Sequence, residues 1–238
     1  MAPPFAPTAD DLAARLYAAN LVDGATAATL SAQQAAVNLS VAVAAAIEDW
    51  EADTGWHPFI AQEQVRVYDP QGPEKGPVGI YLGLNNLGGS RFLFLRSGIL
   101  SVRTLIASIS LTNPAGTVLT QGTDFFLRPR GAADWGWPYT YIEFRVPQYG
   151  NPESISIDGV FGFAAEWPNR AWEAVLDKAF LRAAPELAVL KRGLIQEWKS
   201  GTTEEQYFEK AFTETLSLVQ SRYDDTRRYY QRKEQALG

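Results

Sequence analysis

The stretch from 155 to 184 constrains the fold most, because a strand pattern there passes almost directly into a helix pattern. Ile155 and Ile157 alternate with polar residues, which is the period-2 pattern of a half-buried strand. We expect Asp158-Gly159 to end this strand and Pro185 to end the helix that follows Trp167-Pro168. The apolar face of that helix is formed by Trp172, Leu176, Ala179, Phe180 and Ala183. Both elements are apolar on one side, so the rest of the chain must cover them.

Helices are expected on both sides of this junction. Thr8, Ser31 and Thr202 each stand three positions before an acidic or amide residue, which is a sequence signature of a helix start. The helix from Ser31 should end at Gly55, and the helix from Thr202 should run toward Lys233. The two ends of the chain are therefore predicted to be helical.

Strand patterns fill the middle of the chain, at 64–68, 101–111, 117–120, 125–127 and 142–146. Residues 70–90 are rich in Gly and Pro but lack the Lys-Ser/Thr of a phosphate-binding loop. The predicted fold is α+β: a helical core with an inserted antiparallel β-sheet or small sandwich. We expect three segments: N-terminal helices and a first strand (1–69), a β-rich insertion (70–158) and a C-terminal helical region (159–238) that packs with 1–69 as one core.

Composition excludes several kinds of chemistry. The chain has no cysteine and one histidine, His57, so it has no disulfide, no thiolate nucleophile and no cysteine or paired-histidine metal site. Paired carboxylates have no nucleophile or metal partner near them in the sequence. We therefore expect no cofactor and no enzymatic activity. No apolar run reaches the length of a membrane span and Met1–Thr8 does not resemble a signal peptide, so we expect a soluble chain.

Charge is distributed unevenly along the 238 residues. The net charge of -6 divides into -7 for residues 1–69, +1 for 70–184 and zero for 185–238. General affinity for nucleic acid is not expected, since phosphate binding needs clustered Lys and Arg. The acidic first part and the locally basic tail can instead attract each other across a subunit boundary.

Two charge clusters are candidate contact sites. The acidic cluster is formed by Glu48, Asp49, Glu51 and Asp53, at a helix C-terminus where the dipole disfavours anions. The basic end of the last helix carries Arg227, Arg228, Arg232 and Lys233 beside the Tyr229-Tyr230 pair, which we expect to be exposed. Each cluster is either a solvated helix surface or a contact with another chain.

An aromatic loop at 132–141 is the third candidate. Trp135, Trp137 and Tyr139 lie close together in it. Such rings can stack on sugars or anchor a protein interface, and they can equally cover the core of their own sheet.

The series of motifs resembles the head–tail connector (adaptor) proteins of tailed bacteriophages. The resemblance covers roughly residues 30–184 and rests on Ala46–Glu51 with Gly55, Val65–Asp69, Leu100–Val102, Asn113–Gly116, Phe126–Pro129, Pro138–Ile142, Ile155–Phe163 and Trp167-Pro168. The departure is the tail, because Gln196–Lys233 is longer and more helical than the short endings of that family.

The resemblance implies a structural virion protein rather than an enzyme. It implies a homo-oligomeric ring, commonly a dodecamer, in the neck of the virion, assembled from chains made in the host cytoplasm. Such a ring docks below the portal protein and connects the DNA channel to a stopper or tail-completion protein, and DNA passes through without specific binding.

Three surface hypotheses follow. Arg227, Arg228, Tyr229, Tyr230, Arg232 and Lys233 would dock on the portal, and the acidic cluster would face a neighbouring subunit. Trp135, Trp137 and Tyr139 would lie on a ring or tail-side surface. The alternative is a carbohydrate- or protein-recognition module that uses the aromatic loop.

Overall fold

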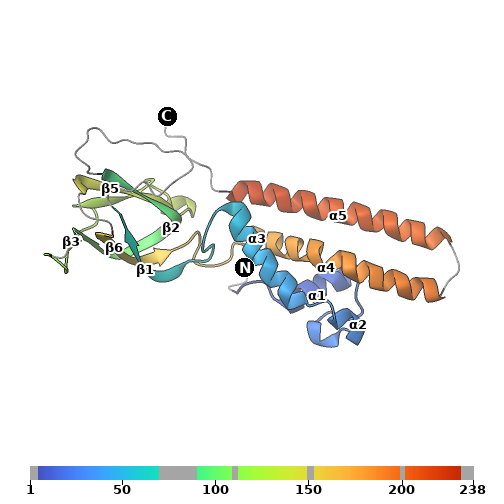
Figure 1. Cartoon of the computed structure of the whole chain (residues 1–238). Coiled ribbons are helices and arrows are strands. Elements are labelled where there is room, and N and C mark those ends of the chain that lie inside the picture. The colour runs from blue at the N-terminus through green and yellow to red at the C-terminus, as the bar shows by residue number, and fades with distance from the viewer. Residues whose placement is uncertain (1–4, 70–89, 109–111, 149–152, 199–201, 232–238) are drawn as a thin grey trace. The chain divides into compact units, whose positions relative to one another are not determined.

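The computed structural model describes residues 5–69, 90–108, 112–148, 153–198 and 202–231 (Figure 1). The described chain forms two compact units, which we call the helical unit (5–54 and 167–231) and the strand unit (55–166). Most of the predicted Gly/Pro-rich connection, 70–89, lies outside the described residues. The fold is α+β, as the sequence predicts.

The helical unit contains the longest helices of the described chain. Its elements are α1 (Ala9–Ala18), η1 (Ala27–Thr29), α2 (Ala32–Ala35), α3 (Leu39–Thr54), α4 (Asn169–Trp198) and α5 (Thr202–Tyr230). The predicted helix start at Thr8 is confirmed, with a capping box in which Thr8 Oγ1 accepts from Asp11 N–H and Asp11 Oδ2 accepts from Thr8 N–H. Figure 1 shows α3, α4 and α5 lying alongside one another.

The predicted helix from Ser31 to Gly55 is instead two helices. Ser31 caps the short α2, and a second start follows at Asn38, whose Oδ1 accepts from Val41 N–H at 3.1 Å. Gly55 ends α3 in the left-handed region, with φ +76°, as expected. The physical reason is that asparagine is unfavourable inside a helix but favourable at its N-cap, where its side chain accepts a hydrogen bond from the first turn.

Pro185 does not end its helix, so that prediction was wrong. α4 continues from Asn169 through Pro185 to Trp198. The proline ring is exposed, while its neighbours Ala184 and Leu187 are buried. Packing of the buried face therefore outweighs the backbone hydrogen bond that proline cannot donate to Leu181, and the helix persists.

Among its described residues, the strand unit is one six-stranded antiparallel sheet. Its strands are β1 (Gln62–Tyr68), β2 (Ser90–Ala107), β3 (Thr117–Leu119), β4 (Phe125–Arg128), β5 (Tyr139–Gln148) and β6 (Ile155–Phe161). The order is β1-β6-β2-β5-β4, and β3 pairs with β2. Its core is formed by Tyr68, Leu93, Leu95, Ile99, Leu105, Ala107, Phe125, Leu127, Ile142, Phe144, Ile155, Ile157 and Phe161.

Asp158-Gly159 does not end its strand, which was the second wrong boundary. β6 runs through Gly159 to Phe161 and pairs with β1 on one side and β2 on the other. A Cβ at Gly159 would lie 2.5 Å from the carbonyl oxygen of Ser101. The glycine therefore allows close approach of β2 rather than a turn.

The boundaries between the units also differ from the predicted ones at 69 and 158. β1 pairs along its whole length with β6, so the first strand belongs to the sheet and not to the N-terminal helices. The segments that lead into and out of the strand unit lie side by side, since Phe59 O accepts from Phe163 N–H at 2.9 Å and Ala164 O accepts from Ala61 N–H at 2.8 Å. The strand unit is thus inserted into the helical unit through two adjacent chain segments.

Candidate interaction surface

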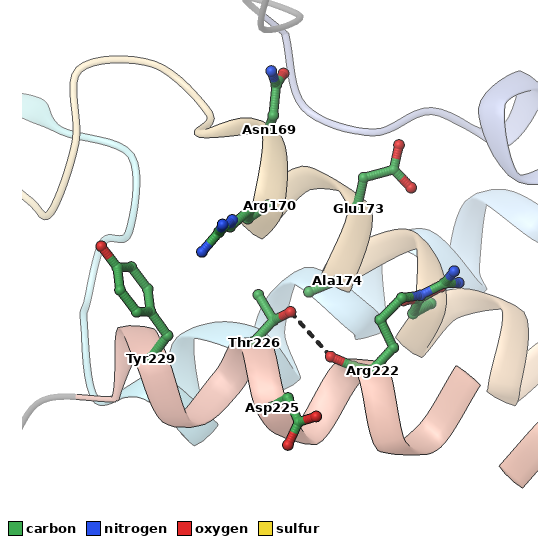
Figure 2. Close-up of a pocket in the computed structure, with 9 residues that line it drawn as sticks. Asn169, Arg170, Glu173, Ala174, Arg222, Asp225, Thr226 and Tyr229 are labelled. Atoms are coloured by element: carbon green, nitrogen blue, oxygen red, sulfur yellow. Dashed lines mark hydrogen bonds and ion pairs between the residues drawn. The ribbon is translucent and has the colours of Figure 1, made fainter. Parts of the chain in front are cut away.

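A groove lies between the first turns of α4 and the last turns of α5 (Figure 2). It measures about 400 Å³ and is lined by Asn169, Arg170, Glu173, Ala174, Asp177, Arg222, Asp225, Thr226 and Tyr229. Most of these side chains are charged or polar, and they come from positions three or four residues apart on each helix, so they share one face. The groove therefore combines residues about 50 positions apart in sequence into one surface.

Asp177 is the buried centre of this groove. Its side chain is 0% exposed, and its carboxylate accepts from Nε of Arg222 at 2.6 Å and from a second nitrogen of the same guanidinium. Arg15 of α1 completes the set, with Nη2 2.6 Å from Asp177 Oδ1. The hydrogen bond with Asp177 raises the pKa of Arg222 above its ordinary value. Two guanidinium groups thus compensate one buried carboxylate, as a desolvated charge requires.

This arrangement ties three helices together and is poorly suited to proton transfer. A carboxylate whose oxygens accept hydrogen bonds from two guanidinium groups has few acceptor positions left for a substrate. The groove is therefore better suited to contact another molecule than to react with it.

Arg170 and Tyr229 form the rim of the groove. Tyr229 is 53% exposed, and the guanidinium carbon of Arg170 lies 5.9 Å from the centroid of its ring. Figure 2 shows Arg170 and Tyr229 on opposite walls, Arg170 on α4 and Tyr229 on α5. An exposed guanidinium beside an exposed phenol ring is a combination that is common in protein interfaces.

The acidic cluster is largely engaged within its own chain. Asp49 Oδ2 lies 2.6 Å from Arg182 Nη2 and 3.6 Å from Lys178 Nζ of α4. Asp53 Oδ2 accepts from the hydroxyl of Tyr223 at 2.7 Å. Glu48 is exposed and Glu51 is half-buried. α4 and α5 thus supply partners for Asp49 and Asp53 within the same chain, and their contact with a neighbouring subunit stays a prediction.

The residues at the basic end of α5 differ in exposure and in pairing. Arg228 is 69% exposed, and its nearest carboxylate, Asp225, is 3.4 Å away and 71% exposed. Tyr230, which was expected to be exposed, is buried, with its ring 5.6 Å from that of Trp50. Arg227 is 34% exposed and lies 3.6 Å from Asp224. Arg232 and Lys233 lie outside the described residues.

Tyr223 and Tyr230 anchor α5 on Trp50 of α3. Burial raises the pKa of both tyrosines above the ordinary value, and for Tyr223 the hydrogen bond to Asp53 raises it further. The ring centroids of Trp50 and Tyr223 are 6.0 Å apart in an edge-to-face arrangement. The side of α5 that carries Tyr223 and Tyr230 thus packs on α3.

The aromatic loop splits into one exposed ring and two packed ones. Trp135 is 81% exposed on the short helix η2 (Ala133–Trp135). Trp137 lies edge-to-face on Phe163, with centroids 5.3 Å apart, and Tyr139 packs against the core of the sheet. The three residues therefore do not form one aromatic surface.

Sequence reasoning missed the Asp177 centre. The available signal was a lone carboxylate inside an apolar helical run, between Leu176 and Ala179. Its partners Arg15 and Arg222 are 162 and 45 positions away in sequence, and no local pattern connects them.

Comparison with known proteins adds no identification: no family model, no curated protein and no solved structure matches this chain. Within the described ranges, no three His, Cys, Asp or Glu side chains come together where they could hold a metal ion. None of the helices built from the described residues combines the length and the apolar composition that crossing a bilayer requires.

Proposed function

We propose that this chain is a structural protein of a bacteriophage neck, a head–tail adaptor that forms a ring below the portal protein. The observation that carries the proposal is the division of the chain, with helices from both ends in one unit and the strands of the middle in an inserted unit. This is the organisation that the resemblance to head–tail connectors implies. The ring, commonly of twelve copies, would connect the DNA channel to a stopper or tail-completion protein in the assembled virion.

The proposed role requires surfaces and no catalysis. The strongest described polar cluster, at Asp177, joins helices to each other. A net charge of -6 favours passage of DNA through a channel without tight binding, because like charges do not attract. We therefore also propose that the chain is not an enzyme.

Portal docking is assigned to the end of α5, with Arg228 as the main described contact. Its side chain is 69% exposed and its pair with Asp225 is too exposed to hold it firmly. Arg227 would contribute less, since it is more buried and lies beside Asp224.

Charge reversal tests this assignment. Arg228→Glu, and then Arg227→Glu with Arg228→Glu, should abolish co-sedimentation with portal rings while the circular dichroism spectrum stays unchanged. Lys210→Glu is the matched control, because Lys210 is an exposed cation at the other end of the same helix. Undiminished portal binding by the double variant would remove the docking assignment.

A recognition module remains the second candidate, and the exposure of Trp135 is the observation that favours it. Glycan binding that is lost in Trp135→Ala and kept in Trp137→Phe would support this candidate. Ring particles in electron micrographs of the chain with portal would support the adaptor.

A further inference from the structure

The exposed face of α3 is a candidate contact surface. Val41 is 61% exposed, and Ala44, Glu48 and Ala52 are exposed with it. Their spacing of three, four and four residues places them in one row along the helix. Trp50, which is buried against α5, lies on the opposite side of α3. The row therefore points away from α4 and α5.

Glu48 is the charged centre of this row. Asp49 and Asp53 have partners on α4 and α5, whereas Glu48 has no ion pair or hydrogen bond from its side chain within the described ranges. Small alanines on both sides of it let another surface approach the helix backbone closely. The row thus offers one free carboxylate between small apolar side chains.

The groove between α4 and α5 has an unpaired positive charge, whereas the α3 row has an unpaired negative charge. Each of its three carboxylates has a cation beside it: Glu173 pairs with Arg15, Asp177 pairs with Arg15 and Arg222, and the exposed Asp225 makes a weaker contact with Arg228 of the same helix. Arg170 has no carboxylate partner among the described residues, and its guanidinium carbon lies 5.9 Å from the centroid of the Tyr229 ring. The groove therefore presents one unpaired guanidinium beside an exposed aromatic ring.

The two surfaces lie on different sides of the helical unit. Lys178 and Arg182, which contact Asp49 of α3, are on one face of α4, and the groove residues Arg170 and Asp177 are on another. A contact between two different surfaces of identical chains is heterologous, and it repeats from copy to copy until the ring closes. A twofold dimer instead uses the same surface on both copies.

We infer that the α3 row of one copy docks into the α4–α5 groove of the next, with Glu48 of one chain paired to Arg170 of the other. This inference rests on the proposed function, because it names the subunit contact of the proposed ring. Tyr229 is the aromatic anchor of the contact, and the alanines of the row lie against it. Closure of the ring adds to the stability of each contact, because the last contact forms within one assembly.

The test is a charge exchange measured by sedimentation velocity over a concentration series, alone and with portal rings. Glu48→Arg alone and Arg170→Glu alone should each weaken self-association by roughly tenfold or more, because like charges then face each other. An equimolar mixture of the two variants should restore association, since each contact in an alternating ring again joins opposite charges. The double variant Glu48→Arg with Arg170→Glu should also associate.

Matched controls are Glu186→Arg and Arg130→Glu, which reverse exposed charges outside both surfaces and should leave association unchanged. Circular dichroism and thermal unfolding show whether each variant is folded. Failure of the mixture to recover association overturns the inference, as does a wild-type chain that remains at 26.2 kDa at every concentration and with portal. Rescue limited to dimers would also overturn it, because it indicates a twofold contact.

These outcomes are separable from the proposed function. Portal binding that is lost in Arg228→Glu but kept in Glu48→Arg would support the adaptor whatever the subunit contact is. Loss of the subunit contact with no binding to portal by the wild type would instead remove the proposed function.

Discussion

Asp177 has no contact with solvent, and its two arginine partners come from helices at opposite ends of the chain. A buried carboxylate that loses its partners is desolvated without compensation. Arg222, whose side chain is 55% exposed, can be hydrated by water, and Arg15 keeps a second partner in Glu173. The single residue Asp177 therefore links α1, α4 and α5.

Asp177→Ala should lower the free energy of unfolding of the helical unit by about 1.5 kcal/mol, because it removes charge-assisted hydrogen bonds while the partly exposed Arg222 can be hydrated and Arg15 keeps Glu173. Urea titration followed by circular dichroism at 222 nm measures the change. Asp225→Ala removes a carboxylate that is 71% exposed and should cost less than about 0.5 kcal/mol. Equal effects of the two substitutions would contradict the role given to Asp177.

Tyr223 gives the protein a defined response to alkaline pH. Its folded pKa is raised above the unfolded value of 10.0 by burial and by Asp53. The unfolded chain then loses its proton first, so the contribution of Tyr223 to stability is complete below pH 10 and decreases as the pH rises further, by about 1.4 kcal/mol per pH unit. Tyr230 acts in the same direction.

Tyr223→Phe should cost about 1 kcal/mol at pH 7, the value of one buried hydrogen bond. Above pH 10 the difference from the wild type should shrink, because the variant lacks one of the groups that destabilise the folded chain there. Thermal unfolding between pH 8 and 11 tests this. Tyr17→Phe, at a tyrosine that is 52% exposed, is the control, and parallel pH curves for Tyr223→Phe and wild type would disprove the account.

At the scale of the elements, β6 depends on the absence of a side chain at Gly159. A Cβ there would lie 2.5 Å from Ser101 O and 2.9 Å from a carbon of Ile99, both in β2. β2 and β6 are the central pair of the sheet, so neither strand can move away without disturbing its other neighbour.

Gly159→Ala should destabilise the strand unit by about 2 kcal/mol, within the usual range for an added group in a packed site. Ser156→Ala, on the same strand, should change stability by less than about 0.5 kcal/mol. Chemical denaturation monitored by tryptophan fluorescence compares them. A neutral Gly159→Ala would mean that the contact of β6 with β2 is not as close as described.

α4 contains a residue that is unfavourable inside a helix, Pro185. Pro185 is exposed and leaves the carbonyl of Leu181 without its backbone donor, so its ring contributes little to packing. The apolar positions on both sides of it keep the helix continuous.

Pro185→Ala should therefore stabilise the helical unit, by about 2 kcal/mol, since proline costs about 3 kcal/mol in a helix interior. Glu186→Ala, at the adjacent exposed position, should have almost no effect. Differential scanning calorimetry would show the gain as a higher Tm. A lower Tm for Pro185→Ala would indicate that the proline has a packing role.

At the scale of the whole molecule, the insertion of one unit into another has a direct consequence. The strand unit has its own buried core, and the two segments that connect it to the helices lie side by side. Inserted units with adjacent ends commonly fold independently.

A fragment of residues 55–166 should fold alone, with a β-type circular dichroism spectrum and a cooperative unfolding transition. A chain in which a short Gly-Ser linker joins Thr54 to Trp167 should keep its helical spectrum and bury Trp50 as the full chain does. NMR spectra of the two isotope-labelled fragments, compared with the spectrum of the full chain, would show whether each unit keeps its structure. An unfolded 55–166 fragment would show that the units depend on each other.

Sequence alone determined the local elements of this protein: the helix start at Thr8, the terminator at Gly55, and the alternation in β5 and β6. These signals succeed because caps and periodicity act within a few residues, which the sequence displays directly. Sequence reasoning misplaced the ends of α4 and β6. The burial of the α4 face beside Pro185 and the close approach of β2 to Gly159 both depend on residues distant in sequence.

Only the tertiary structure decided which charges are paired and which are free. Asp49, Glu48 and Asp53 look equivalent in the sequence, yet Arg182 and Tyr223 engage two of them and leave Glu48 exposed. The same holds for Tyr229 and Tyr230, which differ because neighbouring residues of a helix point in directions about 100° apart. Pairing at long range depends on how the helices pack, and that is set by the summed burial of many side chains rather than by any one motif.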